Sequence, residues 1–165
     1  MTFAMAASDL DKLRSVMARH PEAAEPLGLF LAPTFKPSGY ASTPECCRTF
    51  GWTGGDGVHF SIAEIEVTDS PIVITVPMNF DAPNMVVGNS LREFLALGMT
   101  VGYFSLEKLV YEFEAGLTRI AEGFEFQGPA RSAIEDIRET FALELWNDAR
   151  NRLAFLNAKY AKALR

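Results

Sequence analysis

Two adjacent cysteines, a histidine and an aspartate are the residues of this sequence that could together perform nucleophilic chemistry. Asp56 lies between the Cys46-Cys47 pair and His59, so one hairpin could bring all of them together. An imidazole oriented by a carboxylate can activate a thiolate for covalent catalysis. However, cysteine is a common core residue, nothing in the sequence marks an oxyanion hole, and strand alternation would let only one cysteine reach His59. The sequence therefore assigns no catalytic residue and leaves open whether the protein is an enzyme.

Other catalytic and metal-binding signatures are absent from the sequence. The run from Gly54 to Gly57 superficially suggests a phosphate loop, but it lacks the following lysine and leads into a strand rather than a helix. We interpret it as a tight β-turn, in which valine at Gly55 or Gly57 should cost on the order of 1–3 kcal/mol. Two histidines and a vicinal cysteine pair lack zinc-site spacing, so the sequence predicts no metal and no cofactor.

Bulk composition narrows the class of protein. The chain has 165 residues, 48% of them hydrophobic, with 15 Lys and Arg against 21 Asp and Glu, and a formal net charge of −6. This composition predicts one folded domain spanning residues 1–165. The acidic balance argues against nucleic-acid binding. No apolar run is long enough to span a bilayer and no secretory leader is evident, so the sequence predicts a cytoplasmic protein that does not associate with membranes.

The elements that must position these residues follow from hydrophobic periodicity. A first helix is expected from an N-cap at Ser8 to His20, followed by a proline-rich connection with one short strand near Leu29 to Leu31. The alternating and β-branched runs then predict a hairpin, a polar turn and two further strands. The strands are expected at residues 46–52, 58–63, 72–76 and 85–87, with the polar turn from Glu66 to Ser70.

The remainder of the sequence predicts helices. One should be capped by Asn89 or Ser90 and end at Gly98, and another should be capped by Ser105. From Pro129 onward the pattern fits either one long helix or two helices broken near Asn147 and Asp148. The order helix, strands, helices predicts an α+β fold with a mainly antiparallel central sheet covered by helices. The sheet core should span about residues 45–88, and the helical C-terminal part about residues 105–165.

Aromatic residues near the glycine turn suggest a binding surface. Trp52 beside the turn and Phe80 in the loop before Pro83 are the aromatics most expected to be exposed. Exposed aromatics flanked by acids suit a protein-binding face. The candidate binding residues are accordingly Trp52, Asp56, His59, Phe80 and Asp81.

The middle of the chain resembles the SUKH superfamily, which includes many bacterial immunity proteins. Three segments carry the resemblance: a strand, glycine–acid turn and strand from Phe50 to Phe60, a Pro-initiated strand from Pro71 to Pro77, and a strand leading into a helix from Met85 to Leu95. The Asn-Gly pair typical of the family is missing, and the helical region after Tyr103 is additional. Four segments, at residues 54–60, 76–81, 86–98 and 102–109, are also similar to a family of uncharacterised bacterial proteins. The SUKH resemblance implies a protein that acts by binding rather than by catalysis.

Three functional hypotheses follow. The first is a non-enzymatic protein-binding module, such as an immunity protein that neutralises a cognate toxin domain; the acidic charge would suit a basic partner. The second is a small-ligand-binding protein or enzyme that uses a pocket beside the Gly54–Gly57 turn, with Asp56, His59 and a cysteine. The third, compatible with both, is a homodimer built on an unpartnered apolar stripe from Ile134 to Leu164.

Overall fold

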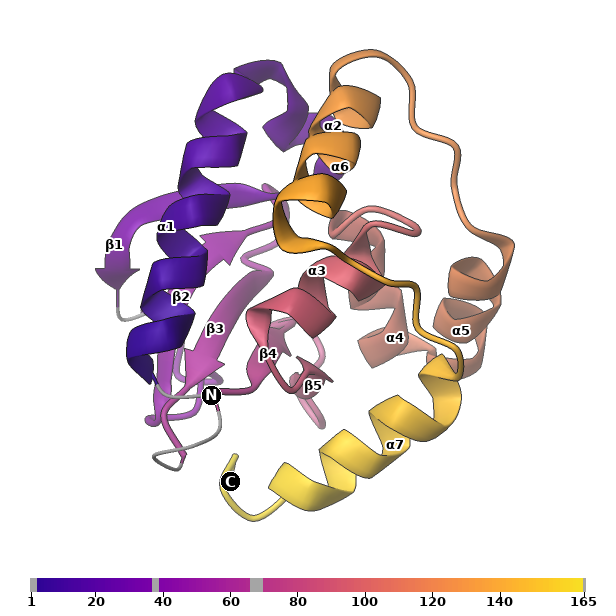
Figure 1. Ribbon diagram of the computed structural model, residues 1–165. Helices are drawn as coiled ribbons and strands as arrows, with labels where there is room; N and C mark the ends of the chain where they lie inside the picture. Colours follow the sequence, from indigo (N-terminus) through magenta and orange to yellow (C-terminus); the bar gives the residue numbers. More distant parts are fainter. Residues whose placement is uncertain (1–2, 37–38, 66–69, 165) are drawn as a thin grey trace.

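Five strands form one antiparallel sheet in which neighbours in the chain are neighbours in space (Figure 1). The computed structural model describes residues 3–36, 39–65 and 70–164. The strands are β1 (Phe30–Lys36), β2 (Cys47–Trp52), β3 (His59–Ala63), β4 (Ile72–Thr75) and β5 (Asn84–Gly88). Helices precede and follow this sheet, which confirms the predicted α+β class. Of the polar turn predicted from Glu66 to Ser70, positions 66–69 lie outside the described residues.

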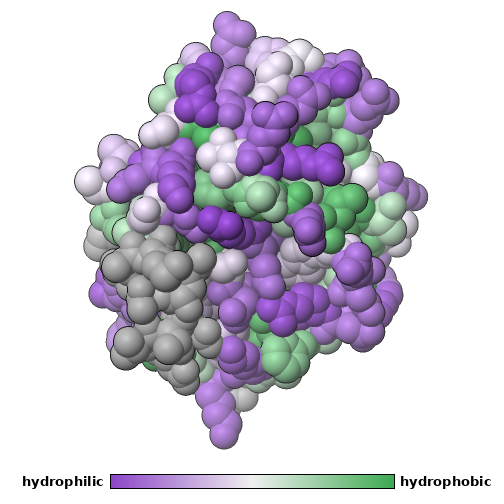
Figure 2. All heavy atoms as spheres, viewed as in Figure 1, coloured by the Kyte–Doolittle hydropathy of each residue, from purple (hydrophilic) through white to green (hydrophobic). Residues whose placement is uncertain are grey.

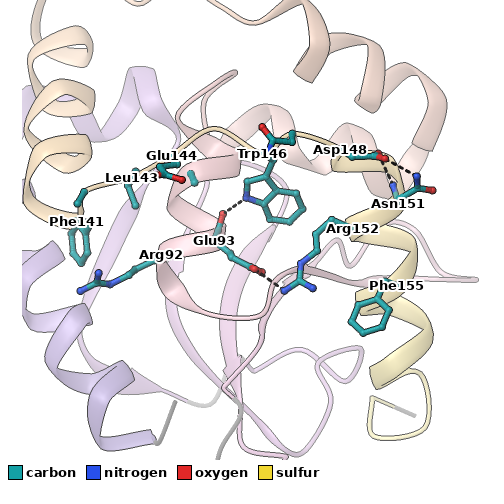
Figure 3. Close-up of a pocket in the computed structure, with 13 residues that line it drawn as sticks. Arg92, Glu93, Phe141, Leu143, Glu144, Trp146, Asp148, Asn151, Arg152 and Phe155 are labelled. Carbon is teal, nitrogen blue, oxygen red and sulfur yellow. Dashed lines mark hydrogen bonds and ion pairs between the residues drawn. The ribbon is translucent and has the colours of Figure 1, made fainter.

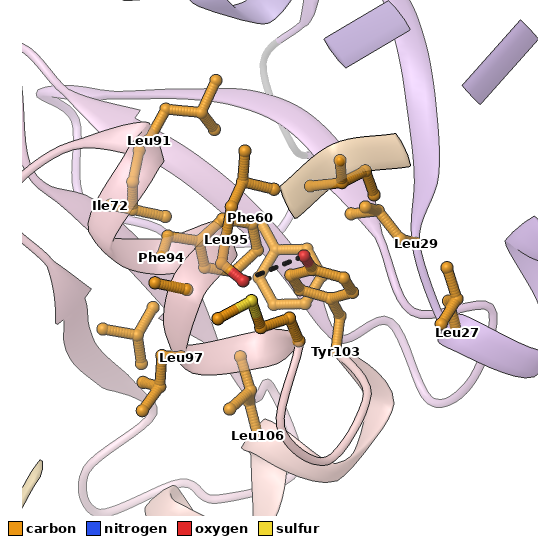
Figure 4. Packing of buried hydrophobic residues seen from close by; sticks show 14 of the residues in the cluster. Leu27, Leu29, Phe60, Ile72, Leu91, Phe94, Leu95, Leu97, Tyr103 and Leu106 are labelled. Atoms are coloured by element: carbon orange, nitrogen blue, oxygen red, sulfur yellow. Dashed lines mark hydrogen bonds between the residues drawn. The ribbon is translucent and has the colours of Figure 1, made fainter. Parts of the chain in front are cut away.

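One face of the sheet is covered by α1 (Phe3–Arg19), α3 (Leu91–Gly98) and α6 (Gly128–Phe141), which lie in front of it in Figure 1. Alternation places Phe60 and Ile62 of β3 on this face, where both are fully buried. Phe94 of α3 lies at the centre of the packing, with its ring centroid 4.9 Å from that of Phe60 and 5.1 Å from that of Tyr103. The Tyr103 hydroxyl donates to the Leu95 carbonyl at 3.1 Å (Figure 4). The one hydroxyl group of these three rings is thus hydrogen-bonded although it is buried.

The opposite face of the sheet is partly covered by α7 (Ala149–Tyr160). Leu156 and Tyr160 pack against Val73 and Val86 on this side. The side-chain amide of Asn157 accepts from the Val86 backbone N–H at 2.8 Å and donates to the Val86 carbonyl at 3.0 Å. Because these bonds occupy backbone groups that a further strand would use, α7 protects the β5 edge.

The first helix and the first strand are both longer than the sequence predicted. α1 begins at Phe3, so Ser8 lies within the helix rather than capping it. β1 runs from Phe30 to Lys36, whereas only Leu29 to Leu31 were expected to be extended. Between them lie the 3-10 helix η1 (Pro21–Ala23) and the short helix α2 (Ala24–Leu27). Pro33 in β1 lowered the strand signal, but proline is tolerated on an edge strand such as this one.

The boundaries of the helices after the sheet agree in part with those predicted from the sequence. Ser90 caps α3 as predicted, and its hydroxyl accepts from the Glu93 backbone N–H at 3.3 Å. Gly98 is the last residue of that helix rather than the cap that follows it. The helix expected to start at Ser105 is divided into η2 (Phe104–Leu106), α4 (Glu107–Tyr111) and α5 (Phe113–Glu122), and Ser105 provides no side-chain cap.

The C-terminal region contains two helices rather than one. α6 and α7 are separated by residues 142–148, and the Asp148 side chain caps α7 by accepting from the Asn151 backbone N–H at 3.0 Å. Leu153, Leu156 and Tyr160 of α7 are buried within the chain itself. The premise of the homodimer hypothesis, an unpartnered apolar stripe along these helices, is therefore wrong for α7.

Candidate functional site

The register of the sheet brings the five predicted binding residues to one end of it. Trp52 ends β2 and pairs with His59, the first residue of β3, and His59 pairs in turn with Thr75 at the end of β4. Asp56 lies in the turn between β2 and β3, while Phe80 and Asp81 lie in the loop between β4 and β5. We call this end of the sheet the turn end.

Four of the five predicted residues are exposed at the turn end, and His59 is not. Phe80 is 82% exposed and Trp52 is 40% exposed, whereas only 3% of His59 is accessible. Asp56 and Asp81 are also exposed. His59 therefore does not belong to the exposed surface that the other four residues form.

Hydrogen bonds fix the His59 ring in the sheet. Its Nδ1 lies 2.7 Å from the Gly57 carbonyl and its Nε2 lies 2.9 Å from the Thr43 hydroxyl. Because a carbonyl can only accept, Nδ1 carries the proton and Nε2 of the neutral ring accepts from Thr43. The Tyr40 ring stacks on the imidazole at a centroid distance of 5.5 Å. Burial lowers the pKa of His59 below its ordinary value, so the neutral form is favoured.

This lowered pKa of His59 predicts a loss of stability in mild acid. Below a pH of about 6.5 the unfolded chain binds a proton that the buried ring resists, so the stabilisation is present above that pH and is lost on acidification. We expect the free energy of unfolding, measured in urea from pH 7.5 to 5.5, to fall less steeply for His59→Gln than for the unmodified protein. Equal slopes would contradict this assignment.

Helical residues after the sheet extend the exposed surface of the turn end. Phe104 and Tyr111 are 48% and 44% exposed. Asn79 in the β4–β5 loop donates to the Val110 carbonyl of α4 at 3.1 Å, which joins the loop to the helix. We define the turn-end surface as Trp52, Asp56, Phe80, Asp81, Phe104, Glu107 and Tyr111.

The carboxylates of the turn-end surface, Asp56, Asp81 and Glu107, form no ion pair in the part of the chain that the structure describes. Burial and the nearby charge of Asp56 raise the pKa of Glu107, although Lys108 opposes this effect. The surface therefore combines apolar rings with carboxylates that form no ion pair among the described residues.

The glycine turn has the geometry of a tight connection. Gly54, Asp56 and Gly57 all have positive φ angles, of 96°, 49° and 72°. A Cβ atom at Gly57 would lie 2.3 Å from the Tyr40 hydroxyl oxygen, whereas one at Gly55 would make only an ordinary contact, 3.5 Å from the Phe104 ring. The expectation of equal strain at Gly55 and Gly57 is thus wrong.

Valine substitutions should separate these two glycines. We expect Gly57→Val to lower the free energy of unfolding by roughly 1–3 kcal/mol because of its backbone conformation and its clash with Tyr40. Gly55→Val should be milder, because its φ lies outside the left-handed region. Urea denaturation of the two variants measures the difference, and a larger loss at position 55 would contradict the turn geometry.

The structure does not bring a cysteine to His59. Cys47 pairs with Ala63 at one end of the β2–β3 ladder, and His59 pairs with Trp52 at the other. Five residues of extended strand separate the two ends by roughly 16 Å. Both thiols are free, and the Cys46 Sγ donates to the Ala163 carbonyl at 3.5 Å. The hypothesis of a Cys–His–Asp site is therefore wrong, although Asp56 and His59 do line one cavity.

Cys47 is expected to be inert in the folded protein. Burial raises the pKa of its thiol, and the neighbouring Cys46 raises it further. In a Cys46→Ser variant the remaining thiol should resist iodoacetamide at pH 7.5 until the protein is denatured. Mass spectrometry before and after denaturation measures this, and rapid labelling of the native protein would contradict the burial of Cys47.

A second cavity, of about 620 Å³, lies between α3, residues 142–148 and α7 (Figure 3). Figure 2 shows apolar side chains between polar ones across the middle of this side of the molecule. The Trp146 indole donates to the Glu93 carbonyl at 3.0 Å, and the Glu93 carboxylate lies 2.6 Å from Arg152. Arg92 is paired with Asp9 at 3.3 Å. Both arginines that line this cavity are thus already paired, and no sequence pattern singles the cavity out.

Residues 3–36, 39–65 and 70–164 contain neither a cluster of potential metal ligands nor a membrane-spanning helix. This part of the chain holds no group of three or more His, Cys, Asp or Glu side chains placed to bind a metal ion. None of its helices is both long and apolar enough to cross a bilayer.

Comparisons with known proteins identify no relative of this chain. No protein-family model matches the chain, and neither the curated proteins nor the solved structures contain a match. The SUKH resemblance therefore stays a prediction from three short segments of sequence.

Proposed function

We propose that this chain is a non-catalytic protein-binding protein whose turn-end surface docks on a basic region of its partner. The observation that carries the proposal is the exposure of several large rings beside carboxylates that have no ion-pair partner in the described chain. Phe80 is the most exposed of these rings, at 82%. Aromatic anchors are enriched at the energetic centres of interfaces.

The negative charge of the turn-end surface indicates what kind of partner it would bind. Asp56, Asp81 and Glu107 present negative charge around the rings, so a partner carrying Lys or Arg would be attracted and oriented. The net charge of −6 acts in the same direction at longer range. A toxin domain with a basic surface is the partner that the SUKH resemblance implies.

Position-specific cross-linking tests this proposal. A photoreactive phenylalanine analogue at position 80 should capture one protein in cells of the source organism, and the purified pair should re-form the complex. The matched control places the same analogue at Phe124, which is 60% exposed and lies outside the turn-end surface. Capture of the same protein from both positions, or from position 124 alone, would contradict docking at the turn end.

A further inference from the structure

The two cysteines lie on the same side of the sheet, beside the end of α7. Cys47, the first residue of β2, is buried in a cluster that includes Leu156 and Tyr160 of α7. Cys46 is partly exposed and packs against the same cluster. It lies in the turn before β2, so strand alternation, which begins at Cys47, does not direct its side chain to the opposite face.

Hydrogen bonds join the two thiols to each other and to the C-terminal segment. The Cys47 thiol is hydrogen-bonded to that of Cys46, and the Cys46 Sγ donates to the Ala163 carbonyl at 3.5 Å. The backbone of the pair is also held in place. The Cys46 carbonyl accepts from the Glu64 N–H at 2.8 Å, and the Cys47 N–H donates to the Pro44 carbonyl at 2.9 Å. The fold therefore keeps two free sulfurs side by side.

Two adjacent thiols select a particular kind of ligand. Zinc takes about four protein ligands, and within the described residues no group of three or more His, Cys, Asp or Glu side chains is placed to supply them. A disulfide between neighbouring residues closes only through a strained ring. Linear two-coordinate ions such as Cu(I) need sulfurs on opposite sides of the metal, whereas trivalent arsenic, also soft and thiophilic, bonds two sulfurs at nearly a right angle. Neighbouring thiols that share a hydrogen bond suit the arsenic geometry.

We propose that Cys46 and Cys47 together form a chelating site for a trivalent arsenical that carries one organic group, R–As=O. Two As–S bonds replace the As=O bond and the two S–H bonds, the two protons leave with the oxygen as water, and the arsenic stays trivalent. Cys46 reacts first because it is the more accessible thiol. Cys47 then reacts within the same molecule, at a high effective concentration. Cys47 lies at the end of the β2–β3 ladder away from the turn end, so this site is independent of protein docking there.

Phenylarsine oxide tests the site in the intact, folded chain. At pH 7.5 an equimolar amount should give a single adduct, in which one C₆H₅As unit replaces two hydrogens in the mass of the protein. An excess of the dithiol dimercaptopropanol should remove this unit, whereas mercaptoethanol at the same thiol concentration should leave it bound, because a monothiol lacks the chelate effect. Absence of the adduct, or equal removal by both reagents, would overturn the proposal.

Single-cysteine variants test whether both thiols are needed. Cys46→Ala and Cys47→Ala should each lose the adduct when free reagent is removed by gel filtration, because one As–S bond is readily hydrolysed. Cys46→Ala changes a partly exposed side chain, so it should remain folded, which circular dichroism verifies. The matched control Glu45→Gln alters the exposed neighbouring residue and keeps both thiols, so it should retain the adduct. Retention by either single-cysteine variant, or loss by Glu45→Gln, would overturn the assignment to the pair.

Discussion

Gly28→Ala should lower the free energy of unfolding by roughly 2–5 kcal/mol, because it combines backbone strain with overpacking. Gly28 has a φ of 63°, and a Cβ there would lie 2.4 Å from the Phe104 Cβ and 2.7 Å from the Phe104 backbone nitrogen. The segments cannot simply separate, because the Tyr103 N–H donates to the Leu27 carbonyl at 2.8 Å. Urea denaturation measures the loss.

Gly55→Ala provides the control for this substitution. A Cβ at Gly55 would lie 3.5 Å from the same Phe104 side chain, in ordinary contact and without a left-handed backbone. Its free energy of unfolding should stay within about 0.5 kcal/mol of the original value. Similar losses for the two variants would contradict the backbone strain and close packing at Gly28.

Phe94→Ala should destabilise the protein by about 3–5 kcal/mol, the usual range for removing a fully buried phenylalanine. The Phe94 ring lies against Phe50, Phe60 and Tyr103, so its removal leaves a cavity between the sheet and α3 (Figure 4). Thermal and urea unfolding should both report the loss. Phe155→Ala is the control, because 56% of that side chain is exposed, and it should cost less than about 1 kcal/mol. A comparable loss at both positions would contradict the central place of Phe94.

Strand periodicity predicted the sheet well because successive residues of a strand face opposite sides of it. Phe60 and Ile62 face the helices while Ser61 and Ala63 face the other side, as the alternation at residues 58–63 indicates. Helix ends were harder to predict from sequence. Ser8 is a good capping residue, yet α1 begins at Phe3, and nothing local to Ser105 indicates that the chain breaks again at Glu112.

The candidate site could be predicted where the exposure of a residue follows from its place in a turn or loop. Trp52 precedes the glycine turn and Asp56 lies within it, and their exposure follows from these positions. Phe104 is 48% exposed although the preceding residue, Tyr103, is fully buried, and the sequence did not single it out. Tyr111 offered a usable signal, since it lies off the apolar face defined by Leu106, Leu109 and Val110. Residues of α4 belong to the turn-end surface because this helix contacts the β4–β5 loop. No local sequence pattern indicates that tertiary contact.

The affinity of the reconstituted complex for variants of the turn-end surface tests the central claim most directly. Phe80→Ala should weaken binding to the cross-linked partner at least tenfold, and Asp56→Lys should slow association and reduce its salt dependence, while Phe124→Ala should bind normally. Unchanged affinity for Phe80→Ala and Asp56→Lys, with both proteins folded, would contradict docking at the turn end.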